Sequence, residues 1–146
     1  MRTIALVAFA FAAPVAAQDC SVSPWKVEIR EDQMQNSPTC MVMRADPREA
    51  IGGLVVTKIG SNTHFSVLGS KPRLSPALIR VDGNEPIYVN ERLNLEHFEK
   101  YGRELYQQLK SGTTVRTQHG VWPGGERVDR EAPICDLIAK IESCPK

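Results

Sequence analysis

The segment WKVEIR, residues 25–30, alternates apolar and charged residues along its whole length. A period of two places successive side chains on opposite faces, which is typical of a β-strand with one buried face. The apolar side chains of Trp25, Val27 and Ile29 are therefore expected to point together into the core. A polar loop separates this strand from a second one at 39–44, so the two are predicted to form a hairpin.

Three more strand pairs are predicted further along the chain, each around a turn rich in glycine, asparagine or proline. The predicted pairs are 54–59 with 64–68, 77–81 with 87–90, and 113–119 with 127–131. Their turns are the four residues Gly60-Ser61-Asn62-Thr63, the Asp82-Gly83-Asn84 segment, and the Trp122-Pro123-Gly124-Gly125 segment.

Two helices complete the predicted elements. The first starts at Asn94 as N-cap, and Gly112 is expected in the left-handed position after its end. Gly102 in its interior weakens this helix by about 1 kcal/mol relative to alanine. The second helix covers 134–143, where apolar residues recur at helical spacing. About eight strands and two helices indicate one β-rich α+β domain.

The amino terminus has the features of a secretory signal peptide. Arg2 is followed by an apolar run over 4–13, and small residues precede an expected cleavage site after Ala17. Lipid attachment is not expected, because Cys20 follows Gln18-Asp19 rather than small apolar residues. We therefore expect a signal peptide at 1–17 and a single exported domain at 18–146.

Charge and hydropathy restrict the partners of the exported domain. Removing Arg2 with the signal peptide leaves 17 basic and 17 acidic residues, so the net charge is zero. A neutral domain gives no electrostatic reason to expect nucleic acid or an anionic membrane surface as partner. No apolar run after the signal approaches the roughly 18 residues that a membrane span needs.

The exported domain contains four cysteines, Cys20, Cys40, Cys135 and Cys144. An even number in a small exported domain favours disulfides, which form in an oxidising compartment. We therefore expect two disulfides and a periplasmic or secreted location. The spacings lack C-x-x-C, H-x-x-x-H and H-E-x-x-H, so no metal site is predicted.

One of the three possible pairings can be argued against. If 134–143 is a continuous helix, Cys135 and Cys144 lie on opposite flanks of its buried stripe, about 13 Å apart along the axis. A disulfide needs Cα atoms roughly 5.5 Å apart. Each of these cysteines is therefore expected to bond to Cys20 or Cys40, and both such pairings remain open.

The sequence contains neither G-x-S-x-G nor a phosphate-binding glycine motif, so we predict no catalytic residue and no cofactor. The scattered histidines, His64, His97 and His119, are interpreted as structural or solvated. Possible contact sites for a partner are Lys71 and Arg73 in a loop stiffened by two prolines, and Trp122 at a hairpin turn.

Several short motifs also occur together in a known family. In chain order they are Trp25-Lys26-Val27, Pro38-Thr39-Cys40, Arg80-Val81-Asp82-Gly83, Leu109-Lys110-Ser111-Gly112, a Gly-Gly hairpin, and an apolar helix ending in Cys144. By their order and spacing, the chain resembles the invasion-associated locus B family of small exported alphaproteobacterial proteins. The resemblance implies a β-sandwich-like exported domain without catalytic activity, associated in some pathogens with entry into host cells.

The chain departs from the family pattern before the last helix, where members usually carry Gly-Phe and this chain has Pro133-Ile134-Cys135. Beside the family pattern, Cys20 and Cys135 look like an additional pair, so the resemblance implies Cys40–Cys144 and Cys20–Cys135 bridges. The expected function is a non-enzymatic module that binds a protein or a component of the cell envelope. The alternative is a periplasmic hydrolase, or an inhibitor of one, whose site has no recognisable motif.

Overall fold

The computed structural model of the 146-residue chain describes residues 19–32, 37–70, 77–89, 95–121 and 125–146. The predicted signal peptide at 1–17 and the predicted N-cap Asn94 lie outside the described residues. None of the helices formed by the described residues is long and apolar enough to cross a bilayer.

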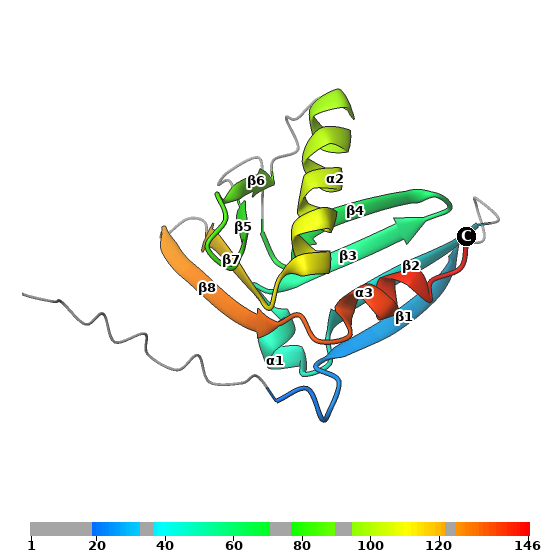
Figure 1. Ribbon diagram of the computed structural model, residues 1–146, viewed down its shortest axis with the longest axis horizontal. Helices are drawn as coiled ribbons and strands as arrows, with labels where there is room; N and C mark the ends of the chain where they lie inside the picture. Colours follow the sequence, from blue (N-terminus) through cyan, green and yellow to red (C-terminus); the bar gives the residue numbers. More distant parts are fainter. Residues whose placement is uncertain (1–18, 33–36, 71–76, 90–94, 122–124) are drawn as a thin grey trace, which may run out of the picture.

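The described strands form two antiparallel sheets of four strands each (Figure 1). The first sheet is a meander in the order β1-β2-β3-β4, with β1 Trp25–Asp32, β2 Ser37–Arg44, β3 Leu54–Ile59 and β4 Asn62–Val67. The second has the order β6-β5-β7-β8, with β5 Ala77–Val81, β6 Ile87–Val89, β7 Thr114–Val121 and β8 Glu126–Pro133. The β-rich α+β fold of antiparallel sheets is thus confirmed.

The described residues form three helices, α1 Pro47–Ala50, α2 Leu95–Ser111 and α3 Leu137–Glu142. Figure 1 shows α2 standing where the two sheets meet, and α3 running along β1 and β2. The sequence analysis did not predict α1. Its start is nevertheless marked, since Asp46 accepts a hydrogen bond from the Arg48 amide and proline occupies the first turn.

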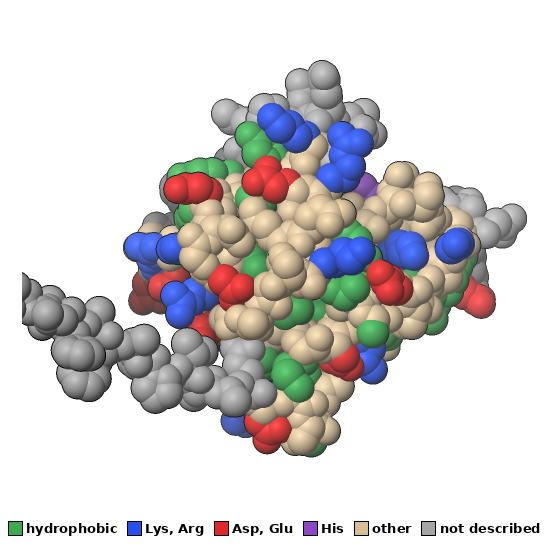
Figure 2. Space-filling model, viewed as in Figure 1, with side chains coloured by type: hydrophobic (Ala, Val, Ile, Leu, Met, Phe, Trp, Pro, Cys, Tyr) green, Lys and Arg blue, Asp and Glu red, His purple; other side chains and the backbone are tan. Residues whose placement is uncertain are grey.

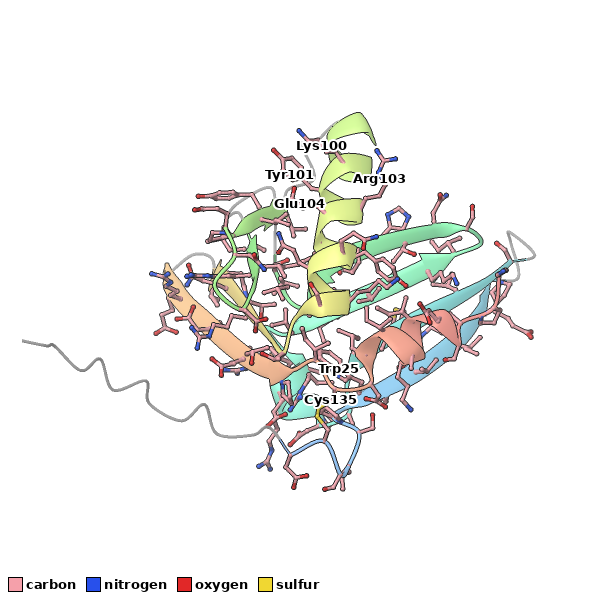
Figure 3. The ribbon with its side chains drawn as sticks, viewed as in Figure 1. Trp25, Lys100, Tyr101, Arg103, Glu104 and Cys135 are labelled. Atoms are coloured by element: carbon pink, nitrogen blue, oxygen red, sulfur yellow. A yellow bond between two sulfur atoms is a disulfide. The ribbon has the colours of Figure 1, made fainter. Side chains whose placement is uncertain are left out.

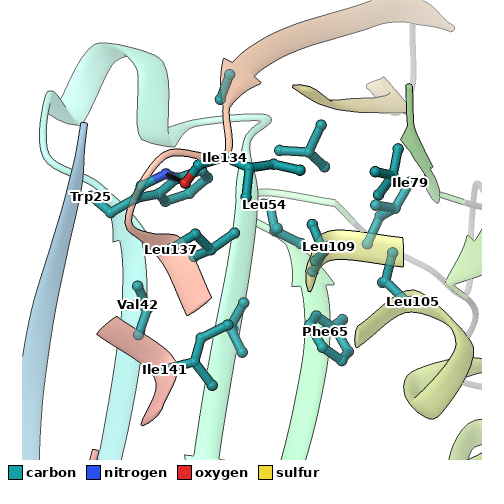
Figure 4. Close-up of a cluster of buried hydrophobic side chains, with 14 of the residues drawn as sticks. Trp25, Val42, Leu54, Phe65, Ile79, Leu105, Leu109, Ile134, Leu137 and Ile141 are labelled. Atoms are coloured by element: carbon teal, nitrogen blue, oxygen red, sulfur yellow. Dashed lines mark hydrogen bonds between the residues drawn. The ribbon is translucent and has the colours of Figure 1, made fainter. Parts of the chain in front are cut away.

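A single hydrophobic core joins both sheets to α2 and α3, in a sandwich-like arrangement (Figure 4). Leu54 comes from the first sheet, Ile79 from the second, Leu105 and Leu109 from α2, and Leu137 from the last helix. Each of these side chains is at most 2% exposed. Because neither sheet covers its own apolar face, the two must fold as one unit.

Four details of the predicted elements were wrong. Ile29 is 53% exposed although Trp25 is buried, because β1 is the outer strand of its sheet and burial decreases along it. The turn after β3 has two residues, since Asn62 already pairs with Ile59. The last helix starts at Leu137 rather than 134, and Cys135 precedes it with a positive φ of 44°.

The fourth detail concerns Gly112, which is not among the glycines with positive φ. A Cβ atom there would lie 2.3 Å from Val81 Cγ1, so this glycine permits a close approach between the end of α2 and β5. Asp82 fixes the same junction by accepting hydrogen bonds from Thr113 and from the Thr114 amide. Burial opposes ionisation of Asp82, but these bonds prevail and lower its pKa.

Two disulfides connect the ends of the domain. Cys20 bonds to Cys135 and Cys40 bonds to Cys144, with Cα separations of 5.6 and 5.8 Å. The pairing implied by the family resemblance is present, and Cys135 is not bonded to Cys144. Two disulfides indicate an oxidising environment outside the cytoplasm.

Trp25 reinforces this connection. Its indole Nε1 donates hydrogen bonds of 3.0 Å to the carbonyl oxygens of Pro133 and Ile134. The guanidinium of Arg44 lies 5.7 Å from the centre of the indole ring, within the range of a cation–π contact. The start of β1 is therefore attached to the segment that leads into α3.

Strand β7 carries two buried polar side chains, those of Thr117 and His119, each 3% exposed. The Thr117 hydroxyl donates to the carbonyl oxygen of Gly52 over 2.6 Å. Within the described residues, His119 Nδ1 has no hydrogen-bond partner. Burial lowers the pKa of His119, and the nearby charge of Arg130 acts in the same direction. The folded domain therefore holds this imidazole neutral.

Removing the Cys40–Cys144 bridge should strongly destabilise the domain. The bridge joins residues 104 positions apart, and loop-closure entropy for a loop of that size is worth up to about 4.7 kcal/mol. A Cys40→Ser/Cys144→Ser double variant should lose much of the roughly 5–15 kcal/mol typical of a domain. Urea unfolding measures this loss, and an unchanged midpoint would contradict it.

His119 should make the fold sensitive to mild acid. Its pKa is lowered in the folded state, so the unfolded chain binds more protons as the pH falls below about 6.5. The free energy of unfolding should therefore fall between pH 7 and pH 5, by at most about 1.4 kcal/mol per pH unit. Urea unfolding of a His119→Gln variant should show a flatter pH dependence, whereas equal slopes would refute the prediction.

Candidate functional groove

A groove of about 600 Å³ lies between α2, α3 and the β3–β4 hairpin. Figure 2 shows the basic side chains and the histidine that gather on this face of the molecule. The described residues that line the groove are Lys58, Ser61, Asn62, Thr63, His64, Phe65, Gly102, Arg103, Tyr106, Gln107, Ile141 and Glu142. Three elements that are distant in sequence thus contribute to one concave surface.

The apolar part of the groove comes from the core side of the hairpin and from α3. Phe65 and Ile141 line it and are 4% and 2% exposed. Tyr106 on α2 joins the two helices, because its hydroxyl donates to the carboxylate of Glu142 over 3.1 Å. Burial raises the pKa of Tyr106, and the bond to Glu142 raises it further, so the phenol stays protonated at neutral pH.

The charged part of the groove is mainly basic. Lys58, on β3, and Arg103, on α2, line the groove together with the imidazole-bearing residue His64. Figure 3 shows Arg103 on the side of α2 that faces the hairpin, while Glu104 lies on the other side. Within the described residues neither Lys58 nor Arg103 forms an ion pair or hydrogen bond, so both cations are available for a ligand.

Gly102 is the unusual residue of this groove. It lies inside the 17-residue helix α2, where glycine costs about 1 kcal/mol relative to alanine. None of the residues whose side chains are described places a heavy atom within 4 Å of the position that a Cβ atom would take. Packing therefore does not require glycine here, in contrast to Gly112. The missing side chain leaves the backbone of α2 exposed to whatever occupies the groove.

The structure does not test the partner contacts predicted from the sequence. Lys71, Arg73 and Trp122 lie outside the described residues. The four cysteines are structural, as expected. Sequence reasoning noted Gly102 only as a weakness of the helix, and it did not connect Lys58 with Arg103. Gly102, an unfavourable residue inside a predicted helix, was the one feature of the sequence that could have indicated the groove.

Smaller hollows lie elsewhere on the described surface. One of about 490 Å³ on the outer face of the second sheet contains Arg116 and Arg127. Both already have acidic partners, in Glu131 and Asp129. Within the described residues, no three His, Cys, Asp or Glu side chains are placed to hold a metal ion.

The 490 Å³ hollow also contains Arg80, which has no acidic partner among the described residues. The groove beside α2 differs from it in its larger volume and in having two such cations, Lys58 and Arg103.

Comparison with known proteins does not assign the chain to a family or a function. No family model, curated protein or solved structure matches the chain. The class that the fold itself defines is a β-rich α+β domain stabilised by two disulfides.

Replacing Gly102 with alanine should stabilise the domain. The added methyl group meets no described atom within 4 Å, and alanine favours a helix over glycine by about 1 kcal/mol. A domain of this size should then gain a few degrees in Tm, measurable by circular dichroism. Gly112→Ala is the matched control and should lower Tm, because its Cβ would collide with Val81. A loss of stability in Gly102→Ala would show that packing does require this glycine.

Proposed function

We propose that the chain is a non-enzymatic binding domain, exported to the periplasm or secreted, and related to the invasion-associated locus B proteins. It binds a component of the cell envelope or another exported protein through the groove between α2 and the β3–β4 hairpin. The observation that carries this proposal is the groove itself, with its volume of about 600 Å³ and its two unpaired cations, Lys58 and Arg103.

The location is supported by two independent features. Arg2 precedes an apolar run over 4–13 and small residues before an expected cleavage site, as in secretory signals. Both pairs of cysteines are bonded, which requires an oxidising compartment to persist. Export followed by cleavage after Ala17 places the domain in such a compartment.

Binding is supported by the size and the composition of the groove. Ligand sites are commonly concave surfaces of about 300–1,000 Å³, mostly apolar with a few polar groups that orient the ligand. The groove has about 600 Å³, buried Phe65 and Ile141 in its lining, and Lys58 and Arg103 free to pair with a ligand. Gly102 lowers the stability of helix α2 although no packing contact with a described side chain requires glycine there. Functional sites often contain residues that are unfavourable for stability.

Site-specific photo-crosslinking in the producing cell tests this proposal. A benzophenone amino acid in place of Gln107 lies in the groove and leaves both cations intact, and the same group at position 116 lies on the outer face of the second sheet. We expect the probe at 107 to give a discrete crosslinked species in the exported fraction, because a bound partner lies against it. The probe at 116 should give none.

Two results would contradict the proposal. Retention of the chain in the cytoplasm with reduced cysteines would refute export. Equal crosslinking from positions 107 and 116, or none from position 107, would refute the groove as the binding surface.

A further inference from the structure

We infer that two copies of the chain associate through the outer edge of β1, so that their first sheets join into one continuous antiparallel sheet. This surface is separate from the groove, and the inference does not rest on the proposed binding function. It follows from the unpaired backbone of β1, from the exposed Ile29 side chain, and from the order of charges along the strand.

Strand β1 has β2 as its one neighbour in the sheet, and its other edge is open (Figure 1). The Ala45 amide donates to the carbonyl oxygen of Pro24 over 2.9 Å, which continues the register of the two strands. Pro24 therefore faces β2. Because backbone groups alternate in direction along an antiparallel strand, every second residue from 25 to 31 directs its amide and carbonyl away from β2.

Three of these four residues have no partner for their backbone. The Trp25 amide and carbonyl oxygen are both satisfied locally, by the Ser23 hydroxyl. Within the described residues, no hydrogen bond reaches the amide or carbonyl of Val27, Ile29 or Glu31. Such a row of unpaired groups is a template for a further strand.

The other outer strands of the two sheets are less suited to strand pairing. In β4, Phe65 is only 4% exposed, and the Val67 carbonyl oxygen already accepts from Ser70. Strand β6 has three residues. Strand β8 ends at Pro133, which has no amide hydrogen and whose carbonyl oxygen accepts from the Trp25 indole. The eight-residue strand β1 has the longest open edge among the described strands.

The order of charges on β1 indicates a second copy of the chain as the partner. Lys26, Glu28 and Arg30 alternate in sign on the face opposite to Trp25, and Glu28 forms ion pairs with both basic neighbours. If a second β1 runs antiparallel with Ile29 opposite its own equivalent, Glu28 of each copy lies opposite Arg30 of the other. Opposite charges at facing positions stabilise a strand pair.

The neighbouring registers bring like charges together. A register centred on Glu28 opposes the two copies of Glu28 and sets Lys26 against Arg30. A register centred on Arg30 opposes the two arginines. Like charges directly opposite each other destabilise a strand pair, so the charge pattern favours the register centred on Ile29.

This register also matches the unpaired backbone groups. Ile29 faces Ile29, and Val27 faces Glu31 of the second copy, so that the copies exchange about six hydrogen bonds. The side chain of Ile29, 53% exposed in one copy, packs against its equivalent across the twofold axis. Strands β1 and β4 are opposite edges of the first sheet, so the dimer leaves the β4 and α2 walls of the groove outside the interface.

Sedimentation velocity of the oxidised, purified chain tests the inference. A single strand edge is a small interface, so we expect a monomer–dimer equilibrium with a Kd of about 10–1000 μM. Glu28→Arg and Arg30→Glu each set like charges against one another and should weaken association by about tenfold. An equimolar mixture of these two variants should recover the dimer, because their charges are complementary.

A second pair of variants tests the backbone pairing. Ile29→Pro removes the central outward amide and leaves the hydrogen bonds to β2 in place, so it should weaken association by about tenfold or more. Arg127→Pro makes the same change on the outer strand β8 and should dimerise like the unmodified chain. Circular dichroism checks that each variant is folded.

Three results would overturn the inference. A chain that stays monomeric up to about 1 mM does not pair with itself, and β1 would then be open only to a strand of another protein. Full dimerisation of Ile29→Pro would place the interface elsewhere. A mixture of Glu28→Arg and Arg30→Glu that associates no more tightly than either variant alone would refute the register.

Discussion

The attachment of α3 to the first sheet is the constraint on which the rest of the molecule depends. A helix of six residues is too short to be stable by itself, because its nucleation cost exceeds what so few hydrogen bonds return. Here the Cys40–Cys144 bridge holds its end, and the Trp25 indole holds the segment before it through the Pro133 and Ile134 carbonyl oxygens. Packing of Leu137 and Ile141 into the core completes the attachment.

The same attachment forms part of the groove. Ile141 and Glu142 lie within three residues of Cys144, so the disulfide positions one wall directly. The opposite wall comes from α2, whose C-terminal end is fixed to β5 by the Gly112 and Asp82 contacts. Both helices are therefore held at their ends by groups outside the groove.

The sequence predicted the fold better than the groove. The alternation of apolar and polar residues identified the strands, because this alternation is a local property of the sequence. The four cysteines predicted two disulfides and therefore an oxidising environment. Periodicity did not show that β1 is an outer strand, so it overestimated the burial of Ile29. The sequence also did not show why position 112 requires glycine, because the requirement comes from the side chain of Val81, which is distant in sequence. Lys58 and Arg103 are 45 positions apart, and only the packing of α2 against the hairpin brings them to one surface.

The order of the cysteines also bears on how the domain matures. The bridges interleave, with the first cysteine bonded to the third and the second to the fourth. A chain is synthesised from its amino end, so Cys20 and Cys40 become available to an oxidant well before either native partner. Thiols that meet early exchange readily through mixed disulfides. A productive route must therefore keep the first two cysteines apart until the carboxyl end arrives, or must correct a premature bond by isomerisation.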